Sequence, residues 1–199
     1  MMFTARKEAL ALALHDAGVF TGRTFDLRPK ENGGSLTPEL VSEIGIVLYG
    51  LACFNDLYYS RVFGEPFAVA FSEASATRRK VPLIYFNVAE GSWKLELHSV
   101  HSKFNAGDKV LVLNGATATG VSTVLSIRAI KDAGLVVKDL MALVDMEQGD
   151  PANLYKEFPD LQIHALFRFS DLLRIFLRNS RIDQSEYDTA IDHITANKQ

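Results

Sequence analysis

The chain has 199 residues, 48% of them hydrophobic and 23% charged, which is enough apolar material for one domain with a sizeable core. Its formal net charge of −3 gives no general attraction to nucleic acid or to an anionic membrane. The single cysteine, Cys53, excludes an internal disulfide, and no apolar run approaches the roughly 20 residues that a membrane helix needs. We therefore expect a soluble, cytoplasmic protein with a single domain over residues 1–199 and no nucleic-acid or membrane partner.

The first half of the chain predicts helices and strands in mixed order. Thr37 followed by Pro38 has the form of a helix start, and this helix is expected to reach about Gly50. The other helices are expected over residues 5–16 and 67–77. Strands are expected over residues 23–27, 57–62 and 81–87, with an edge strand or hairpin arm over 95–100.

The second half has clearer boundaries. After a turn at 105–108, residues 109–113 form a continuous apolar run of the buried strand type. A helix over 119–133 ends at Gly134, where a C-terminal cap belongs, and a strand over 135–144 follows. Strand, helix and strand in this order make a βαβ unit, so the class is α/β with a mainly parallel sheet. The remaining elements are a strand over 161–167, a helix over 171–178, and a last helix that opens with a capping box of Asp183 and Glu186.

The stretch KVLVLNGATATGVST, residues 109–123, reads as a strand, a glycine-containing loop over 114–120 and a helix start. Ligands of open α/β sheets lie beyond the carboxyl ends of strands, and the backbone N–H groups of a helix start favour an anion. A phosphate-binding loop is therefore predicted here, although an ordinary βα turn has the same composition. Its residues are Thr117, Ala118, Thr119, Gly120, Val121 and Ser122.

Several segments, in matching order and spacing, resemble the type I phosphoribosyltransferases, and among them orotate phosphoribosyltransferase. They are TFDLR (24–28), GEPFAVAF (64–71), KVPLIY (80–85), NAGDKVLVLNGATATGVST (105–123) and KDAGLVVKDLMALVDMEQG (131–149). The resemblance implies a type I phosphoribosyltransferase-like fold: a mainly parallel central sheet flanked by helices, with a small N-terminal hood region. It also implies a homodimer and, in an active member, transfer from phosphoribosyl pyrophosphate to orotate with magnesium.

The same resemblance shows where this chain departs from the family pattern. The two acids that hold the ribose hydroxyls in the family correspond here to Asn114 and Gly115, so both negative charges are absent. The arginine that contacts the orotate carboxylate corresponds to Met146, which cannot pair with a carboxylate. No lysine or arginine lies between Lys80 and Lys94, where the family has a basic run, and the context of Lys94 does not match that of the catalytic lysine.

Three hypotheses follow from these departures. The first is an orotate phosphoribosyltransferase-like protein that descends from enzymes of pyrimidine nucleotide metabolism and is catalytically impaired. No catalytic residue and no certain cofactor are assigned to it. It keeps a phosphate- or nucleotide-binding loop and acts in binding or regulation. The second is an active phosphoribosyltransferase, for orotate or another base, that holds pyrophosphate with Arg23, Lys94 or Lys103 and uses magnesium. The third is a structural interaction protein that binds no ligand.

Other polar residues have simpler interpretations. His98 and His101 lie three apart on an expected strand and point to opposite sides, so no metal site is predicted there. Asp26 with Arg28 is interpreted as a structural salt bridge, and Glu147 as a solvated acid of a turn. The apolar segment 166–176 is expected in the core, or alternatively in a subunit interface. The histidines without an evident partner are His15, His164 and His193.

Overall fold

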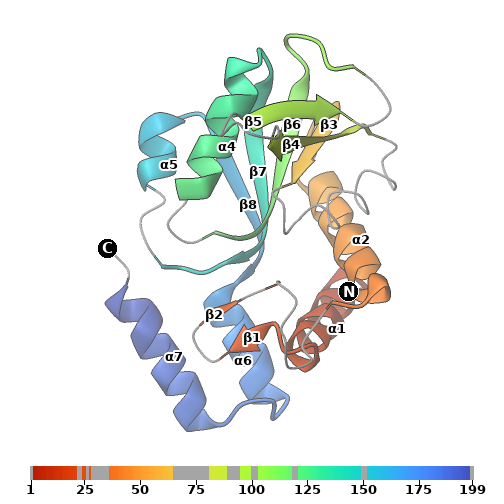
Figure 1. Ribbon diagram of the computed structural model, residues 1–199. Helices are drawn as coiled ribbons and strands as arrows, with labels where there is room; N and C mark the ends of the chain where they lie inside the picture. Colours follow the sequence, from red (N-terminus) through yellow and green to blue (C-terminus); the bar gives the residue numbers. More distant parts are fainter. Residues whose placement is uncertain are drawn as a thin grey trace.

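The structure is a computed structural model that describes residues 2–21, 24–25, 27, 36–64, 81–88, 95–99, 103–117, 121–148 and 152–197. Within these residues, six strands form a sheet of order β5-β4-β3-β6-β7-β8 (Figure 1). Every neighbouring pair is parallel except β4 and β5, so the predicted mainly parallel sheet is confirmed. The strands are β3 (Arg61–Gly64), β4 (Leu83–Val88), β5 (Leu95–Ser99), β6 (Lys109–Thr117), β7 (Val136–Asp145) and β8 (Gln162–Arg168).

Helices cover both faces of this sheet. They are α1 (Met2–Asp16), α2 (Pro38–Phe54), α4 (Val121–Asp132), α5 (Ala152–Glu157), α6 (Phe169–Arg178) and α7 (Gln184–Ala196). Along β6, Leu111 and Leu113 pack with the cluster that includes α1, α2 and α6, whereas Val110 and Val112 pack with α4 and α5. Because β6 is buried on both faces, its sequence is a continuous apolar run rather than an alternating one. None of the described helices combines the length and the apolar character needed to cross a membrane.

The predicted helix ends are confirmed at three places. The Thr37 hydroxyl accepts the Leu40 N–H at 3.2 Å, and Asp183 and Glu186 form the capping box that opens α7. Gly134 has φ +84° and closes α4, because the left-handed conformation at this position suits glycine. These local signals fix the ends of helices without help from distant residues.

Several predicted boundaries differ from the structure: α1 begins at Met2 rather than at residue 5, α2 ends at Phe54 rather than near Gly50, and two strand ends were wrong. The strand expected over 57–62 begins only at Arg61, because Asp56 has φ +51° and the Leu57 N–H donates to Ala52 O, so this segment still closes α2. The strand expected to end at residue 113 continues to Thr117, because its last residues pair with β7. The strand expected over 23–27 is present as the shorter β2 (Thr24–Phe25), whereas its antiparallel partner β1 (Phe20–Thr21) and helix α5 were not predicted. The expected helix over 67–77 and the Asp26–Arg28 salt bridge lie outside the described residues.

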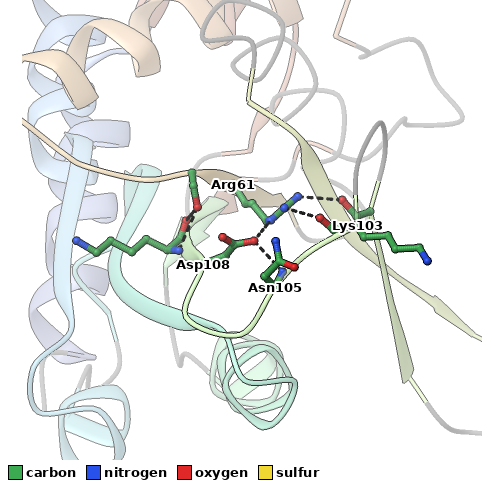
Figure 2. Close-up of polar contacts among 7 residues, drawn as sticks. Arg61, Lys103, Asn105 and Asp108 are labelled. Carbon is green, nitrogen blue, oxygen red and sulfur yellow. Dashed lines mark hydrogen bonds and ion pairs between the residues drawn. The ribbon is translucent and has the colours of Figure 1, made fainter.

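A buried arginine joins three segments at the amino-terminal edge of the sheet (Figure 2). Arg61 is 6% exposed, and its Nε donates to Asp108 Oδ2 at 2.6 Å. Its Nη2 donates to the Lys103 carbonyl at 2.7 Å, and its Nη1 to Ser99 Oγ at 3.3 Å. Asp108 also accepts the Asn105 N–H at 2.9 Å; this bond and the Arg61 guanidinium hold the pKa of Asp108 below its usual value. Arg61 thus fixes the start of β3 against the end of β5 and the turn before β6.

Candidate functional site

The candidate site lies at the carboxyl ends of β6 and β7, which are neighbours in the sheet. Thr117, the last residue of β6, pairs with Asp145, the last residue of β7, and its carbonyl accepts the Met146 N–H at 3.0 Å. Helix α4 begins at Val121, so the expected phosphate loop connects this strand end to this helix start. Residues 118–120 lie outside the described residues, while Thr117 and the exposed Ser122 are placed on either side of them. The structure thus brings the two predicted ends of the loop to the edge where a ligand is expected.

Asn114 is directed into the protein and joins β6 to α4. Its side-chain Nδ2 donates to Thr123 Oγ1 at 2.9 Å, and the two residues are 3% and 2% exposed. The other amide atom, Oδ1, is buried and has no hydrogen-bond partner among the described residues. Gly115 is buried as well. The two positions that the resemblance assigns to ribose recognition therefore offer no carboxylate, and the one side chain present is engaged in structural contact.

Met146 is also part of the core. It is 5% exposed and belongs to the apolar cluster that contains Val144 and Phe167. A buried thioether has no charge and only a weak acceptor, so it provides no partner for a ligand carboxylate. The position assigned to orotate recognition thus contributes packing to the end of β7.

Glu147 has a structural role that the sequence did not indicate. Its backbone has φ +53°, its N–H donates to Asp145 Oδ1 at 3.0 Å, and its Oε2 accepts the Ser170 N–H at 2.7 Å. Ser170 lies in the first turn of α6, whose N-cap residue, Arg168, makes no side-chain cap bond. Glu147 therefore caps α6 from the adjacent turn, and the interpretation as a solvated acid was wrong.

Removal of this cap gives a first testable expectation. Glu147→Ala is expected to lower the free energy of unfolding by about 1–2 kcal/mol, because an N–H of the first turn of α6 loses its acceptor. Glu147→Gln keeps an acceptor oxygen and should lose less. Urea unfolding followed by circular dichroism measures both, with Asp160→Ala as a control that removes an exposed carboxylate from a turn. Equal midpoints for Glu147→Ala and the control would show that Glu147 does not cap α6.

Other predicted site residues lie elsewhere. The Lys103 carbonyl is bound by Arg61 at the amino-terminal edge of the sheet, away from Thr117, whereas Arg23 and Lys94 are outside the described residues. The His98 ring stacks on the Tyr85 ring, 5.9 Å between centroids, and His101 is not described. Within the described ranges, no three His, Cys, Asp or Glu side chains gather as a metal site would require.

The expectation that three histidines lack partners was wrong. His164 Nε2 lies 2.9 Å from Asp139 Oδ1, because the register of β7 and β8 brings the two side chains together. His15 Nδ1 lies 3.4 Å from Asp16 Oδ1, and His193 Nδ1 lies 3.3 Å from an amide nitrogen of Asn197. Strand register is set by tertiary pairing, so the His164 contact has no signal in the local sequence.

The segment 166–176 forms core, as predicted. Its buried residues are Leu166, Phe167, Phe169, Leu172, Leu173 and Phe176, and they belong to the cluster that contains α1 and α2. The Phe20 ring packs against the rings of both Phe169 and Phe176, with 5.2 Å between the centroids in each pair. This cluster packs the N-terminal hairpin onto α6; a role in a subunit interface stays a prediction.

Comparison with known proteins gives phosphoribosyltransferases as relatives. No protein-family model matches the chain. An orotate phosphoribosyltransferase of Thermoplasma volcanium is 25% identical over 166 residues, which are 82% of this chain and 94% of the relative. One from Natronomonas pharaonis is 33% identical over 76 residues, 38% of this chain and 43% of the relative, so here the match spans less than half the relative's length. A hypoxanthine/guanine phosphoribosyltransferase of Methanococcus vannielii is 44% identical over 139 residues, 63% of this chain and 73% of the relative.

Solved structures share the fold. The UMP synthase of Leishmania donovani superposes with a TM-score of 0.70 at 21% identity, over 96% of this chain and 42% of that one. The orotate phosphoribosyltransferase of Mycobacterium tuberculosis in complex with phosphoribosyl pyrophosphate superposes with a TM-score of 0.61 at 22% identity, over 84% of this chain and 92% of that one. At this level of identity the likeness establishes the architecture: a type I phosphoribosyltransferase fold.

Proposed function

Because this chain belongs to the orotate phosphoribosyltransferase family of type I phosphoribosyltransferases, we propose that it is a catalytically impaired member that acts in binding or regulation. It binds phosphoribosyl pyrophosphate or a nucleotide through residues 117–122, and it forms a homodimer. The M. tuberculosis relative holds phosphoribosyl pyrophosphate in its solved complex, which supports the choice of ligand. The start of α4 and the Ser122 hydroxyl supply donors for a phosphate group.

The observation that carries the proposal is the state of Asn114. A ribose diol donates two hydrogen bonds, and carboxylates are the strongest acceptors for them. Here the Asn114 amide is 3% exposed and already donates to Thr123, and Gly115 has no side chain. Loss of two charge-assisted bonds, each contributing about 1.5–3 kcal/mol, corresponds to a roughly 10²- to 10⁴-fold loss in transition-state stabilisation.

Magnesium, which the resemblance implies for an active member, does not fit the described residues. The ion prefers carboxylate, carbonyl and water oxygens in octahedral geometry. At the end of β6 neither Asn114 nor Gly115 provides a carboxylate, and at the end of β7 Asp145 Oδ1 accepts the Glu147 N–H. This chain's part in the proposed binding is therefore the phosphate loop, without a protein-held ion.

Two measurements test the proposal. Incubation with phosphoribosyl pyrophosphate, magnesium and orotate, followed by orotate absorbance, is expected to show no consumption above the protein-free background. The same incubation with hypoxanthine or guanine extends the test to the base named by the M. vannielii relative. Turnover comparable to that of an orotate phosphoribosyltransferase assayed in parallel would overturn the impairment.

Calorimetry with phosphoribosyl pyrophosphate and with orotidine monophosphate tests the binding part. Saturable binding is expected, and the double variant Thr119→Val/Ser122→Ala should weaken it because both hydroxyl donors are removed. Ser185→Ala, which removes an exposed hydroxyl from α7, is the matched control and should leave the affinity unchanged. Absence of binding of either ligand to the unmodified chain would favour the purely structural role.

A further inference from the structure

A hollow lies at the edge of the sheet opposite to the candidate site. Its volume is about 350 Å³, and it is bordered by the first residues of three neighbouring strands, Lys109 of β6, Val136 of β7 and Gln162 of β8. The loop that follows α2 closes one side with residues 55–58. Pockets of roughly 300 Å³ and above accommodate small organic ligands, so this hollow has room for one. Thr117 and Met146 lie at the other ends of the strands, so the two sites are separate.

Two lysines line this hollow without acidic partners. Lys109 Nζ lies 4.5 Å from the centroid of the Tyr58 ring, and Lys138 is exposed on β7. Across the described part of the chain, neither ammonium group has a carboxylate within ion-pair distance. The nearby Asp139 carboxylate is instead hydrogen-bonded to His164, with side-chain exposures of 23% and 18%. The lining therefore offers two available cations to an anionic group.

The carboxyl-terminal end of α2 repels an anion at this hollow less strongly than a helix end with unsatisfied carbonyls would. The carbonyl of Leu51 accepts from both the backbone N–H and the side-chain amide of Asn55. The carbonyls of Ala52 and Cys53 accept the N–H groups of Leu57 and Asp56. Since these terminal carbonyls are satisfied, much of the local negative potential of the helix end is compensated.

The lining also presents an aromatic surface and an acceptor. Tyr58 is 70% exposed, so ring surface remains available for stacking on a planar ligand. Asp56 is exposed in the adjoining turn and carries a carboxylate that accepts N–H groups. A ligand that combines a dianionic group, a planar ring and ring N–H donors satisfies all three features at once.

We propose that this hollow binds a nucleoside monophosphate, with the phosphate at Lys109 and Lys138, the base against Tyr58, and a base N–H donated to Asp56. The modest volume favours a mononucleotide over a dinucleotide. The site is independent of the phosphate loop and of the proposed function, because it uses other residues at the other edge of the sheet.

Calorimetric titration with uridine monophosphate tests the proposal, in the Thr119→Val/Ser122→Ala background that weakens the loop site. Binding is expected to persist there, and Lys138→Gln or Tyr58→Ala should each reduce the affinity about tenfold. Uridine and inorganic phosphate are each expected to bind more weakly, because each lacks one half of the recognised ligand.

A matched control comes from the end of α4, which packs on the other face of the sheet from α2 and does not line the hollow. Lys131 lies over the Phe158 ring at 4.9 Å, much as Lys109 lies over Tyr58, so Lys131→Gln should leave the affinity unchanged whereas Lys109→Gln should lower it. Uridine monophosphate binding that is abolished in the loop background, or unaffected by Lys138→Gln and Tyr58→Ala, would overturn the proposal. Either result is independent of the orotate assay, so failure of this site is distinguishable from failure of the proposed function.

Discussion

Arg61→Met is expected to lower the free energy of unfolding by about 3 kcal/mol or more. The guanidinium is 6% exposed and holds three acceptors, Asp108 Oδ2, the Lys103 carbonyl and Ser99 Oγ. A methionine fills much of the same volume but leaves these acceptors without their donors and leaves the Asp108 carboxylate without its counterion. The loss should therefore exceed that of an ordinary surface substitution. Chemical unfolding followed by circular dichroism measures it.

An exposed pair in the same chain provides the control. Arg128 binds both carboxylate oxygens of Glu157, at 2.8 and 2.7 Å, but its side chain is 54% exposed. Because exposed ion pairs contribute about 0–1 kcal/mol, Arg128→Met should have a small effect. Arg61→Lys keeps the charge but not the planar fork, so an intermediate loss is expected. Equal losses for Arg61→Met and Arg128→Met would show that burial of Arg61 does not matter.

The same network predicts the direction of the pH dependence. The pKa of Asp108 is held below its usual value by the Asn105 N–H and by Arg61. A lowered folded-state pKa means that the ionised carboxylate stabilises the fold at pH values above its unfolded pKa of about 3.9. This contribution is lost as the pH falls through the lower folded pKa. The stability difference between the unmodified chain and Asp108→Asn should therefore shrink in acid and be constant near neutrality.

What the sequence predicted well was set by local chemistry. The apolar run at the start of β6, the glycine that ends α4 and the capping box of α7 each depend on residues a few positions apart, and each was found where expected. The antiparallel edge strand β5 also agreed with its predicted place. Such features need no knowledge of the tertiary fold.

What the sequence missed depends on contacts between distant segments. Arg61 and Asp108 are 47 positions apart, and Glu147 and Ser170 are 23 apart, so neither bond has a local signature. Asn114 and Gly115 have low strand propensity, yet pairing with β7 carries the strand past them to Thr117. The resemblance singled out these two positions as ribose-binding sites, which stays a prediction, and only the structure reveals that the Asn114 amide bonds Thr123 inside the protein.

Asn114→Asp is expected to destabilise the protein by about 1–3 kcal/mol at neutral pH without restoring turnover. The substitution places a carboxylate where the side chain is 3% exposed and removes the donor to Thr123 Oγ1. The Thr123 hydroxyl, which accepts from Asn114, can rotate and donate to the new carboxylate instead. The positive amino-terminal end of α4 is also close, so part of the desolvation cost is offset. Desolvation remains the larger effect because the site is closed to water.

The pH dependence of this variant has the opposite sign to that of Asp108. Burial raises the pKa of the introduced carboxyl in the folded state, so the cost is absent below the unfolded pKa of about 3.9 and grows to its full value above the raised folded pKa. Chemical unfolding of the unmodified chain and of Asn114→Asp at several pH values measures this difference. A variant as stable as the unmodified chain near neutrality would show that position 114 accepts a charge readily.

A double-mutant cycle of Asn114→Ala with Thr123→Val isolates the contact between the two side chains, because neither substitution introduces a new hydrogen-bonding group. Thr123→Val leaves the Asn114 amide without its acceptor, and the two substitutions together should cost less than the sum of the single effects if the residues act as a pair. The double variant Asn114→Asp/Gly115→Asp restores both family acids but adds no cation for pyrophosphate. We therefore expect it to consume no orotate in the assay with phosphoribosyl pyrophosphate and magnesium. Turnover by that variant would mean that these two positions alone separate this chain from an active enzyme.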